Sequence, residues 1–160
     1  MTSPTSRLAE LGLRLPTPAR PAFAYVPVVQ HCELIFVSGQ LPKVDGQVQA
    51  TGIVGAGVTL AQARDAAIVC TLQGLACAAE HLGNLDLIDR VLRVTGFVAS
   101  APDFHEQPEV IDAASDLLEK TFGEDGRHAR SAVGVCALPR AAPVEIEFIF
   151  TTDIPDNHRR

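Results

Sequence analysis

The sequence has few aromatic side chains and no concentration of positive charge. It contains no tryptophan, one tyrosine and seven phenylalanines, and its 13 lysines and arginines are outnumbered by 19 aspartates and glutamates, for a formal net charge of -6. A nucleic-acid surface needs cations against the phosphates and aromatic rings on which unpaired bases stack. Nucleic acid is therefore not an expected partner.

Metal-ligand spacing and long apolar runs are also absent. The four cysteines are scattered, and no HxH or HxxxH pair occurs. The N-terminal MTSPTSRLAELGL lacks the apolar core of a signal peptide, which favours a reducing cytoplasm. The longest apolar stretch, AAIVCTLQGLACAA, is shorter than the ~20 residues that span a bilayer. We therefore expect a cytoplasmic protein with no bound metal and no membrane partner.

The length and the distribution of prolines indicate one domain with flanking segments. A chain of 160 residues suffices for one domain with its own core. Residues 1–24 are expected to form a surface arm with a short helix around Arg7 to Leu13, after which the prolines of RLPTPARPAFA prevent regular helix. The domain itself is expected over residues 25–152, followed by a short tail over residues 153–160.

Within the domain, the patterns predict the order β-β-β-α-β-α-β-β. Thr59 and Gln62 have the spacing of a capping box at the start of a long helix, and Gly83 is a suitable stop. A second helix presents one apolar face and ends at Gly123. This order predicts an α+β fold in which two helices cover one face of a single mixed sheet.

The last two strands lie in the segment HARSAVGVCALPRAAPVEIEFIF. Alternation directs Val144, Ile146 and Phe148 toward the helices and places Glu145 and Glu147 on the opposite face. Most strand-borne charges are ordinary solvated surface, so the two glutamates alone do not establish a site.

If these two strands form a hairpin that turns at Arg140, alternation assigns Val133 and Val135 to the core. Arg130 then shares the second face with Glu145, roughly 20 Å away at the usual strand rise. That face is small and semi-apolar, which favours burial against another subunit. We therefore expect an oligomer. Two interpretations of Arg130 and Glu145 stay open at this point: they are ordinary surface charges, or they come from two chains and form one site in which the guanidinium binds a small carboxylate and the glutamate orients water.

The motifs FVSGQLP, GFVASAPDF, ARSAVGVCALP and VEIEFIF resemble those of the Rid family, also called YjgF-type proteins, which are reactive-intermediate imine and enamine deaminases. The resemblance extends from about Tyr25 to Thr151. It implies a chorismate-mutase-like fold and a homotrimer with sites in the clefts between subunits.

The resemblance also implies roles for individual residues. Arg130 matches the arginine that holds the substrate carboxylate, and Glu145 matches the acid that positions the hydrolytic water. Tyr25, Ser38 and Gly39 match residues that line the cleft.

Two positions depart from the family pattern. Ala132 stands where many members have a cysteine, so this position can contribute only its backbone to substrate binding. Asp112 stands where an asparagine is expected and adds a negative charge. The N-terminal arm and the long segment between GFVAS and ARSAV indicate a longer branch of the family.

The activity implied by the resemblance is hydrolytic deamination of small 2-imino or enamine acids to 2-keto acids and ammonia. The expected ligand is a small imine or keto acid that bears a carboxylate, and no cofactor is expected because an imine is already electrophilic. Two alternatives stay open, a non-catalytic binder of keto acids and an endoribonuclease, and the acidic charge argues against the latter.

Overall fold

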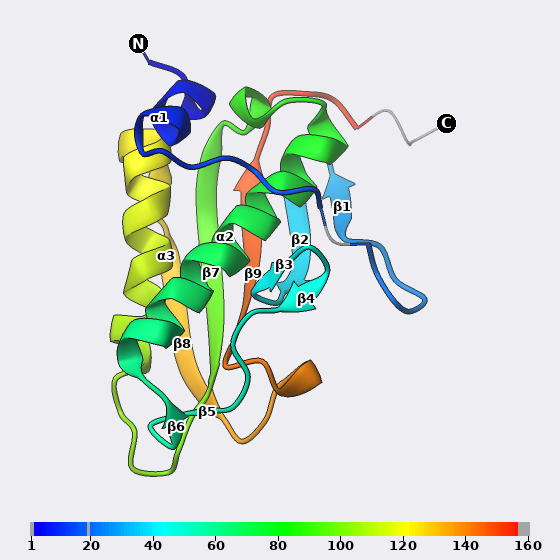
Figure 1. The fold of residues 1–160 in the computed structure, drawn as a ribbon. Helices are drawn as coiled ribbons and strands as arrows, with labels where there is room; N and C mark the ends of the chain where they lie inside the picture. Colours follow the sequence, from blue (N-terminus) through cyan, green and yellow to red (C-terminus); the bar gives the residue numbers. More distant parts are fainter. Residues whose placement is uncertain (1, 19, 157–160) are drawn as a thin grey trace.

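The centre of the computed structural model, which describes residues 2–18 and 20–156, is a five-stranded sheet with helices on one face (Figure 1). Its strand order is β1-β2-β9-β7-β8, and β8 runs parallel to β7 while the other neighbours are antiparallel. The fold class predicted from the sequence is confirmed. The strands are β1 (Val28–His31), β2 (Leu34–Gln40), β7 (Arg90–Ala99), β8 (Ala129–Val135) and β9 (Val144–Thr151).

Two long helices, α2 (Leu60–Leu82) and α3 (Gln107–Phe122), cover the sheet. The predicted capping box starts α2: the Gln62 amide donates to the Thr59 hydroxyl at 3.2 Å, and the Thr59 amide donates to the Gln62 side chain at 2.9 Å. Gly83 ends the helix with a φ of 90°, a conformation that favours glycine. No helix within the described residues is long and apolar enough to cross a bilayer.

The N-terminal segment begins with α1 (Pro4–Glu10), which packs beside α3. Leu8 of this helix is buried in the core, and the Thr5 amide donates to the Asp86 carboxylate at 2.7 Å. After α1 the chain runs across α2 to the opposite side of the molecule, where it leads into β1 (Figure 1). This path brings the end of the N-terminal segment close to β2.

The sequence predicts three N-terminal strands in the sheet, but only β1 and β2 belong to it. The third strand is replaced by two-residue pairs outside the main sheet. The short pairs are β3 (Lys43–Val44) with β4 (Gln47–Val48), and β5 (Ile53–Val54) with β6 (Gly57–Val58). Asp45 and Gly46 both have left-handed φ values, 51° and 79°, and form a tight turn between β3 and β4. The residues on either side of this turn pair with each other and do not extend the main sheet.

The predicted hairpin of the last two strands is wrong, because β7 lies between β8 and β9. The helical connection through α3 returns the chain parallel to β7, which places β8 at the sheet edge. The chain then passes the end of β7, where the Ala99 amide donates to the Pro143 carbonyl and the Ser100 amide donates to the Val135 carbonyl. The turn at η3 (Pro139–Ala141) belongs to this crossing, and β9 enters the sheet beyond it.

The core lies between the sheet and α2 and α3. As predicted, β9 buries Val144, Ile146, Phe148 and Phe150 on this side. The rings of Phe148 and Phe150 stack with their centroids 5.6 Å apart. Gly74 of α2 sits against the Phe148 ring, where any side chain would overlap it, so the helix packs close to the sheet.

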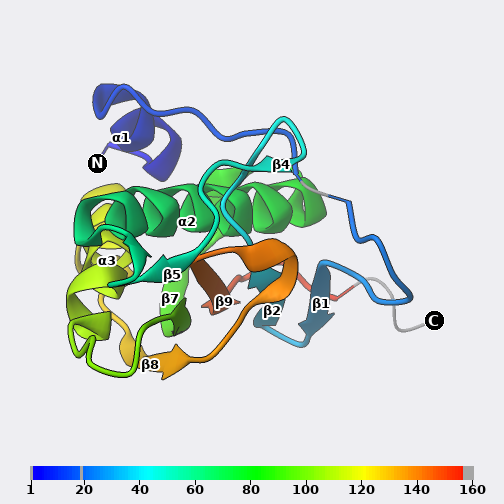
Figure 2. The same ribbon diagram turned by 60° about the horizontal axis from the view of Figure 1, so that its bottom comes forward.

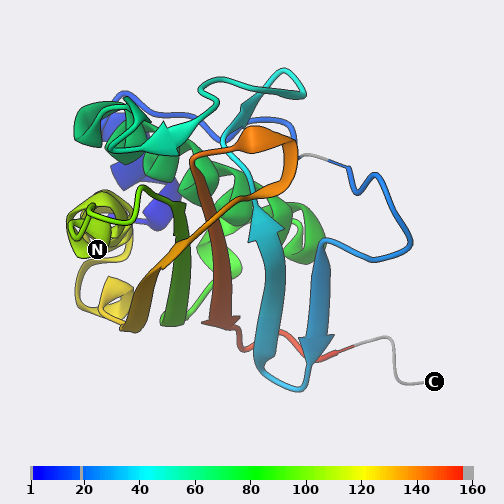
Figure 3. The same ribbon diagram turned by 90° about the horizontal axis from the view of Figure 1, so that it is seen from below.

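The other face of the sheet carries no helix, as two further views show (Figure 2, Figure 3). Val29, Phe36 and Val133 are 51%, 40% and 43% exposed on this face. The exposure of Val133 contradicts its predicted place in the core. The uncovered face thus combines apolar side chains with charged ones, Glu147 among them.

Candidate functional site

A pocket of about 360 Å³ brings together four of the residues predicted from the sequence, Tyr25, Ser38, Gly39 and Glu145. They come from three segments: the chain just before β1, strand β2, and the start of strand β9. Three cationic residues that the sequence reasoning did not single out line the same pocket. We call this set the Glu145 pocket: Arg20, Tyr25, Ser38, Gly39, Lys43, Arg140 and Glu145.

The Glu145 side chain lies directly against Gly39, where a Cβ atom would overlap its carboxylate. The close approach is possible because the pairing of β2 with β9 is irregular between Val37 and Gln40. Glycine at position 39 therefore makes room for the acid.

The surroundings of Glu145 raise its pKa. Within the described residues, its carboxylate accepts no hydrogen bond and forms no ion pair. Partial burial raises the pKa of Glu145 above its usual value, and the neighbouring Glu147 raises this pKa further. A carboxyl group with a raised pKa in a pocket can exchange protons with a reacting group closer to neutral pH.

Ser38 has a structural part in the pocket wall. Its hydroxyl donates to the Val26 carbonyl at 2.9 Å, and its amide donates to the Pro27 carbonyl at 2.9 Å. These bonds attach the segment that carries Tyr25 to β2. Tyr25 is 53% exposed, so its ring stands at the mouth of the pocket.

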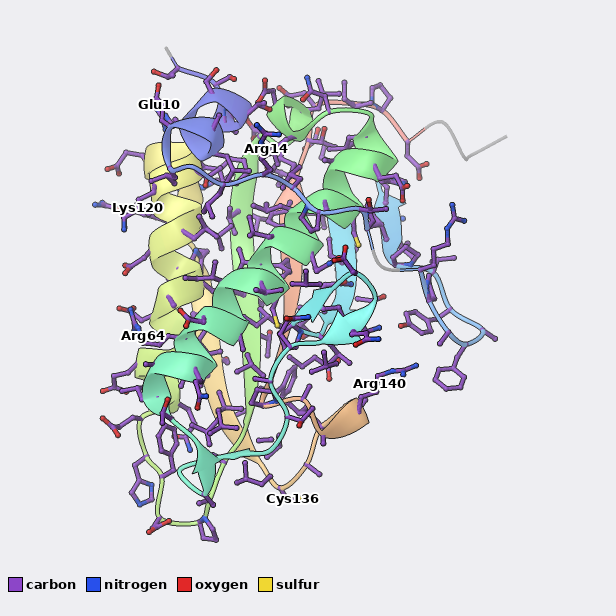
Figure 4. All side chains as sticks on the ribbon, in the orientation of Figure 1. Glu10, Arg14, Arg64, Lys120, Cys136 and Arg140 are labelled. Carbon is purple, nitrogen blue, oxygen red and sulfur yellow. The ribbon has the colours of Figure 1, made fainter. Side chains whose placement is uncertain are left out.

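Arg140 reaches the pocket from a turn with unusual backbone geometry. Arg140 and Ala141 have φ values of 57° and 55°, in the left-handed region that non-glycine residues seldom occupy. The Gly52 amide donates to the Ala141 carbonyl at 2.9 Å and fixes this turn. Figure 4 shows Arg140 projecting outward from η3, on the side of the molecule where the N-terminal segment reaches β1.

Arg130 does not lie in the Glu145 pocket. It pairs with the buried Val94 of β7 and so points toward the helices, whereas Glu145 pairs with Phe97, whose side chain is on the opposite face. The predicted shared face is therefore wrong, because alternation in β8 follows the parallel partner β7 and not a hairpin turn. Ala132 likewise packs against the core and is remote from the pocket.

Arg130 instead belongs to a group on the helix side of β8. One guanidinium nitrogen, Nη1, donates to Asp112 at 3.2 Å and to the Ser115 hydroxyl at 3.0 Å. Asp112, whose orientation the sequence left open, thus faces Arg130, and its side chain is 55% exposed. We call this set the Arg130 cluster: Asp112, Ser115, His128 and Arg130.

His128 completes this cluster in its neutral form. Its Nδ1 lies 2.6 Å from the Gly126 carbonyl, which can only accept, so Nδ1 carries the hydrogen and Nε2 accepts from Ser115 at 3.0 Å. Burial lowers the pKa of His128, and the positive charge of Arg130 lowers it too. The cluster thus orients Arg130 through neutral partners on one side and Asp112 on the other.

With the geometry in place, comparison with known proteins identifies the family. A family model described as "YjgF/chorismate_mutase-like, putative endoribonuclease" matches residues 5–150. The chain belongs to this YjgF/chorismate-mutase-like family. Protein TCP17 from Trypanosoma cruzi is 45% identical over 143 residues, which are 89% of each chain.

Two crystal structures are similar to this chain over nearly its whole length. Atu1372 from Agrobacterium tumefaciens is 46% identical with a TM-score of 0.87, and covers 94% of this chain and 92% of its own. A "putative endoribonuclease" from Shewanella oneidensis is 30% identical with a TM-score of 0.90, and covers 93% and 99%. The crystal structure of E. coli TdcF with bound serine, at 22% identity and a TM-score of 0.58, supports the fold alone.

Among the described residues, neither a set of metal ligands nor a buried thiol forms an alternative centre. No three His, Cys, Asp or Glu side chains among them gather as metal ligands. The four cysteines are free, two of them buried, and burial raises the pKa of Cys77 to about 11. The Glu145 pocket is therefore the best candidate for a site in this YjgF-family protein.

Proposed function

We propose that this protein hydrolyses small reactive 2-imino acids and their enamine forms to 2-keto acids and ammonia in the Glu145 pocket. The observation that carries the proposal is Glu145 itself: a half-buried carboxyl group with a raised pKa and no ion pair among the described residues, in a pocket walled by Tyr25, Ser38 and Gly39. Such a group is suited to general acid–base catalysis.

The reaction needs two rounds of proton transfer, from water to nitrogen and then from the carbinolamine hydroxyl to nitrogen, and one carboxyl group can perform both. Glu145 removes a proton from a water molecule as its oxygen attacks the imine carbon, and the C=N π electrons move to nitrogen. Glu145 then returns this proton to nitrogen, which gives the neutral carbinolamine. In a second round Glu145 takes the proton of the carbinolamine hydroxyl and delivers it to the amino group, the C–N bond breaks with its electron pair going to nitrogen, and ammonia leaves while the carbonyl forms. No electrons enter or leave overall, so the reaction requires no oxidant or reductant.

Arg130 can hold the substrate carboxylate only if it comes from a second chain, because it lies on the other face of the sheet from Glu145. The uncovered apolar face supports an assembly of several copies. In the proposed homotrimer, Glu145 of one subunit and Arg130 of its neighbour form one site. The free cysteines are compatible with a cytoplasmic location.

The test is an assay with 2-iminobutyrate generated in situ from 2-aminobutyrate by an amino-acid oxidase. The proposal predicts that the protein accelerates the release of ammonia and 2-oxobutyrate, in equal amounts, above the uncatalysed rate. Binding of 2-oxobutyrate without any acceleration would show a non-catalytic keto-acid binder instead. The endoribonuclease of the family description receives no support from the acidic charge of this chain.

A further inference from the structure

The Glu145 pocket carries more positive charge than one carboxylate requires. Arg20, Lys43 and Arg140 all line it, and Glu145 is the only acid that does so among the residues that the structure describes. This gathering of cations stands out in a chain whose formal net charge is -6. Within the described part of the chain, none of the three cations forms an ion pair, so their charges are available to a ligand.

Hydrogen bonds fix the backbone that carries two of the three cations. The Lys43 carbonyl accepts from the Gln73 side chain, itself buried in α2, at 2.8 Å. Arg140 stands on the left-handed turn that the Ala141 carbonyl fixes to Gly52. Sparsely populated backbone conformations persist where the surrounding structure holds them, and they are frequent at ligand sites. We call Arg20, Lys43 and Arg140 the cationic rim of the pocket, and these hydrogen bonds hold the backbone at Lys43 and beside Arg140.

The size of the pocket also exceeds the need of a four-carbon acid. At about 360 Å³ it falls in the range of pockets that take ligands larger than 2-iminobutyrate. A ligand whose imine carbon is near Glu145 and whose chain extends toward Lys43 and Arg140 would bring its far end among the cations. A 2-imino acid forms by oxidation of the corresponding amino acid, so the imines of aspartate and glutamate carry a second carboxylate at the end of the side chain.

We infer that the cationic rim, chiefly through Lys43 and Arg140, is a subsite for a second carboxylate. The substrate class is then the 2-imino dicarboxylic acids. The inference rests on the proposed deaminase function, because it names the substrate of the same site. Arg130 of the neighbouring chain would take the carboxylate next to the imine, and the rim would take the distal one. Charge-assisted bonds to a carboxylate are roughly twice as strong as neutral ones.

The experiment compares the imine of glutamate with that of 2-aminobutyrate, each generated in situ by an amino-acid oxidase. The wild type should show a kcat/KM about tenfold higher for the dicarboxylic imine, as one good charged contact provides. In the double variant Lys43→Gln/Arg140→Gln this ratio should fall to near one. The control, Lys120→Gln, removes an exposed cation of α3 on the opposite side of the molecule (Figure 4) and should keep the wild-type ratio.

Calorimetric binding of 2-oxoglutarate and 2-oxobutyrate separates the two hypotheses. Hydrolysis of both imines at equal kcat/KM, or a ratio unchanged in the double variant, would overturn the second-carboxylate subsite and leave the deaminase standing. If neither imine is hydrolysed but 2-oxoglutarate binds more tightly than 2-oxobutyrate, and only through Lys43 and Arg140, the deaminase fails and the subsite stands. Equal binding of the two keto acids without hydrolysis would reject both.

Discussion

The Glu145 pocket and the Arg130 cluster lie on opposite faces of one sheet and differ in how their charges are balanced. Arg130 is bonded to Asp112 and Ser115, and through Ser115 to a neutral His128. Glu145 has no partner of this kind among the described residues, and burial raises its pKa. The cluster is therefore built to hold a guanidinium in one position, whereas the pocket leaves a carboxyl group free to exchange a proton.

The largest effect is expected from removing the proton-exchanging group. Glu145→Gln keeps the shape of the side chain and should lower kcat for 2-iminobutyrate by about 10²–10⁴-fold, the usual contribution of a general acid–base. The matched control is Glu147→Gln, two residues further along β9 and on the same face, which should retain most of the activity. Equal losses in the two variants would contradict the special role of Glu145.

A smaller but still large effect should follow from Gly39→Ala. A methyl group at position 39 would displace the Glu145 carboxylate, so activity should fall at least about tenfold and stability by about 1–3 kcal/mol, as for overpacking. Urea denaturation should show that the stability loss disappears when Glu145 is also alanine. A loss that persists in the Glu145→Ala background would mean that Gly39 is needed for its backbone and not for the acid.

In the Arg130 cluster, removal of the acidic group should strengthen ligand binding, whereas removal of Glu145 from the pocket should weaken activity. Asp112→Asn removes the charge that competes with a ligand for Arg130, so 2-oxobutyrate should bind up to about fivefold more tightly, the worth of an exposed ion pair. Asp116→Asn on the same helix, whose carboxylate lies 4.0 Å from Arg64, is the control and should leave the Kd unchanged. Weaker binding in Asp112→Asn alone would show that Asp112 holds Arg130 in its binding position.

The smallest expected effect is a pH dependence of stability. Because the pKa of Glu145 is raised on folding, the folded state binds this proton more tightly than the unfolded state, and stability is lost as the pH rises through the folded pKa. Glu145→Gln should therefore be more stable than the wild type at neutral pH. Denaturation curves should show the difference shrinking as the pH falls below the ordinary pKa of glutamate, and a difference that grows in acid would contradict the raised pKa.

Local patterns in the sequence were sufficient for the first long helix and for the core face of the last strand. The capping box at Thr59 and the alternation in β9 depend on neighbours a few residues apart, and both are found in the structure. The resemblance to known motifs also placed Ser38, Gly39 and Glu145 together, and they do share a pocket.

The face on which Arg130 lies could not be predicted, because it depends on which strand is its neighbour. The segment LPRAAP has the residues of a hairpin turn, yet its strands are separated by β7, which is distant in the sequence. The cationic rim escaped prediction for a similar reason. Arg20, Lys43 and Arg140 come from three segments that only the folded chain brings together.

Complementation between two inactive variants tests the central claim, that each site combines the Glu145 pocket of one chain with Arg130 of another. Glu145→Gln and Arg130→Ala would be co-expressed and the mixed assemblies assayed with 2-iminobutyrate. In a cyclic oligomer with random mixing, about a quarter of the sites would hold both intact residues, so about a quarter of the wild-type activity should return. Activity no higher than that of the separate variants would contradict the claim.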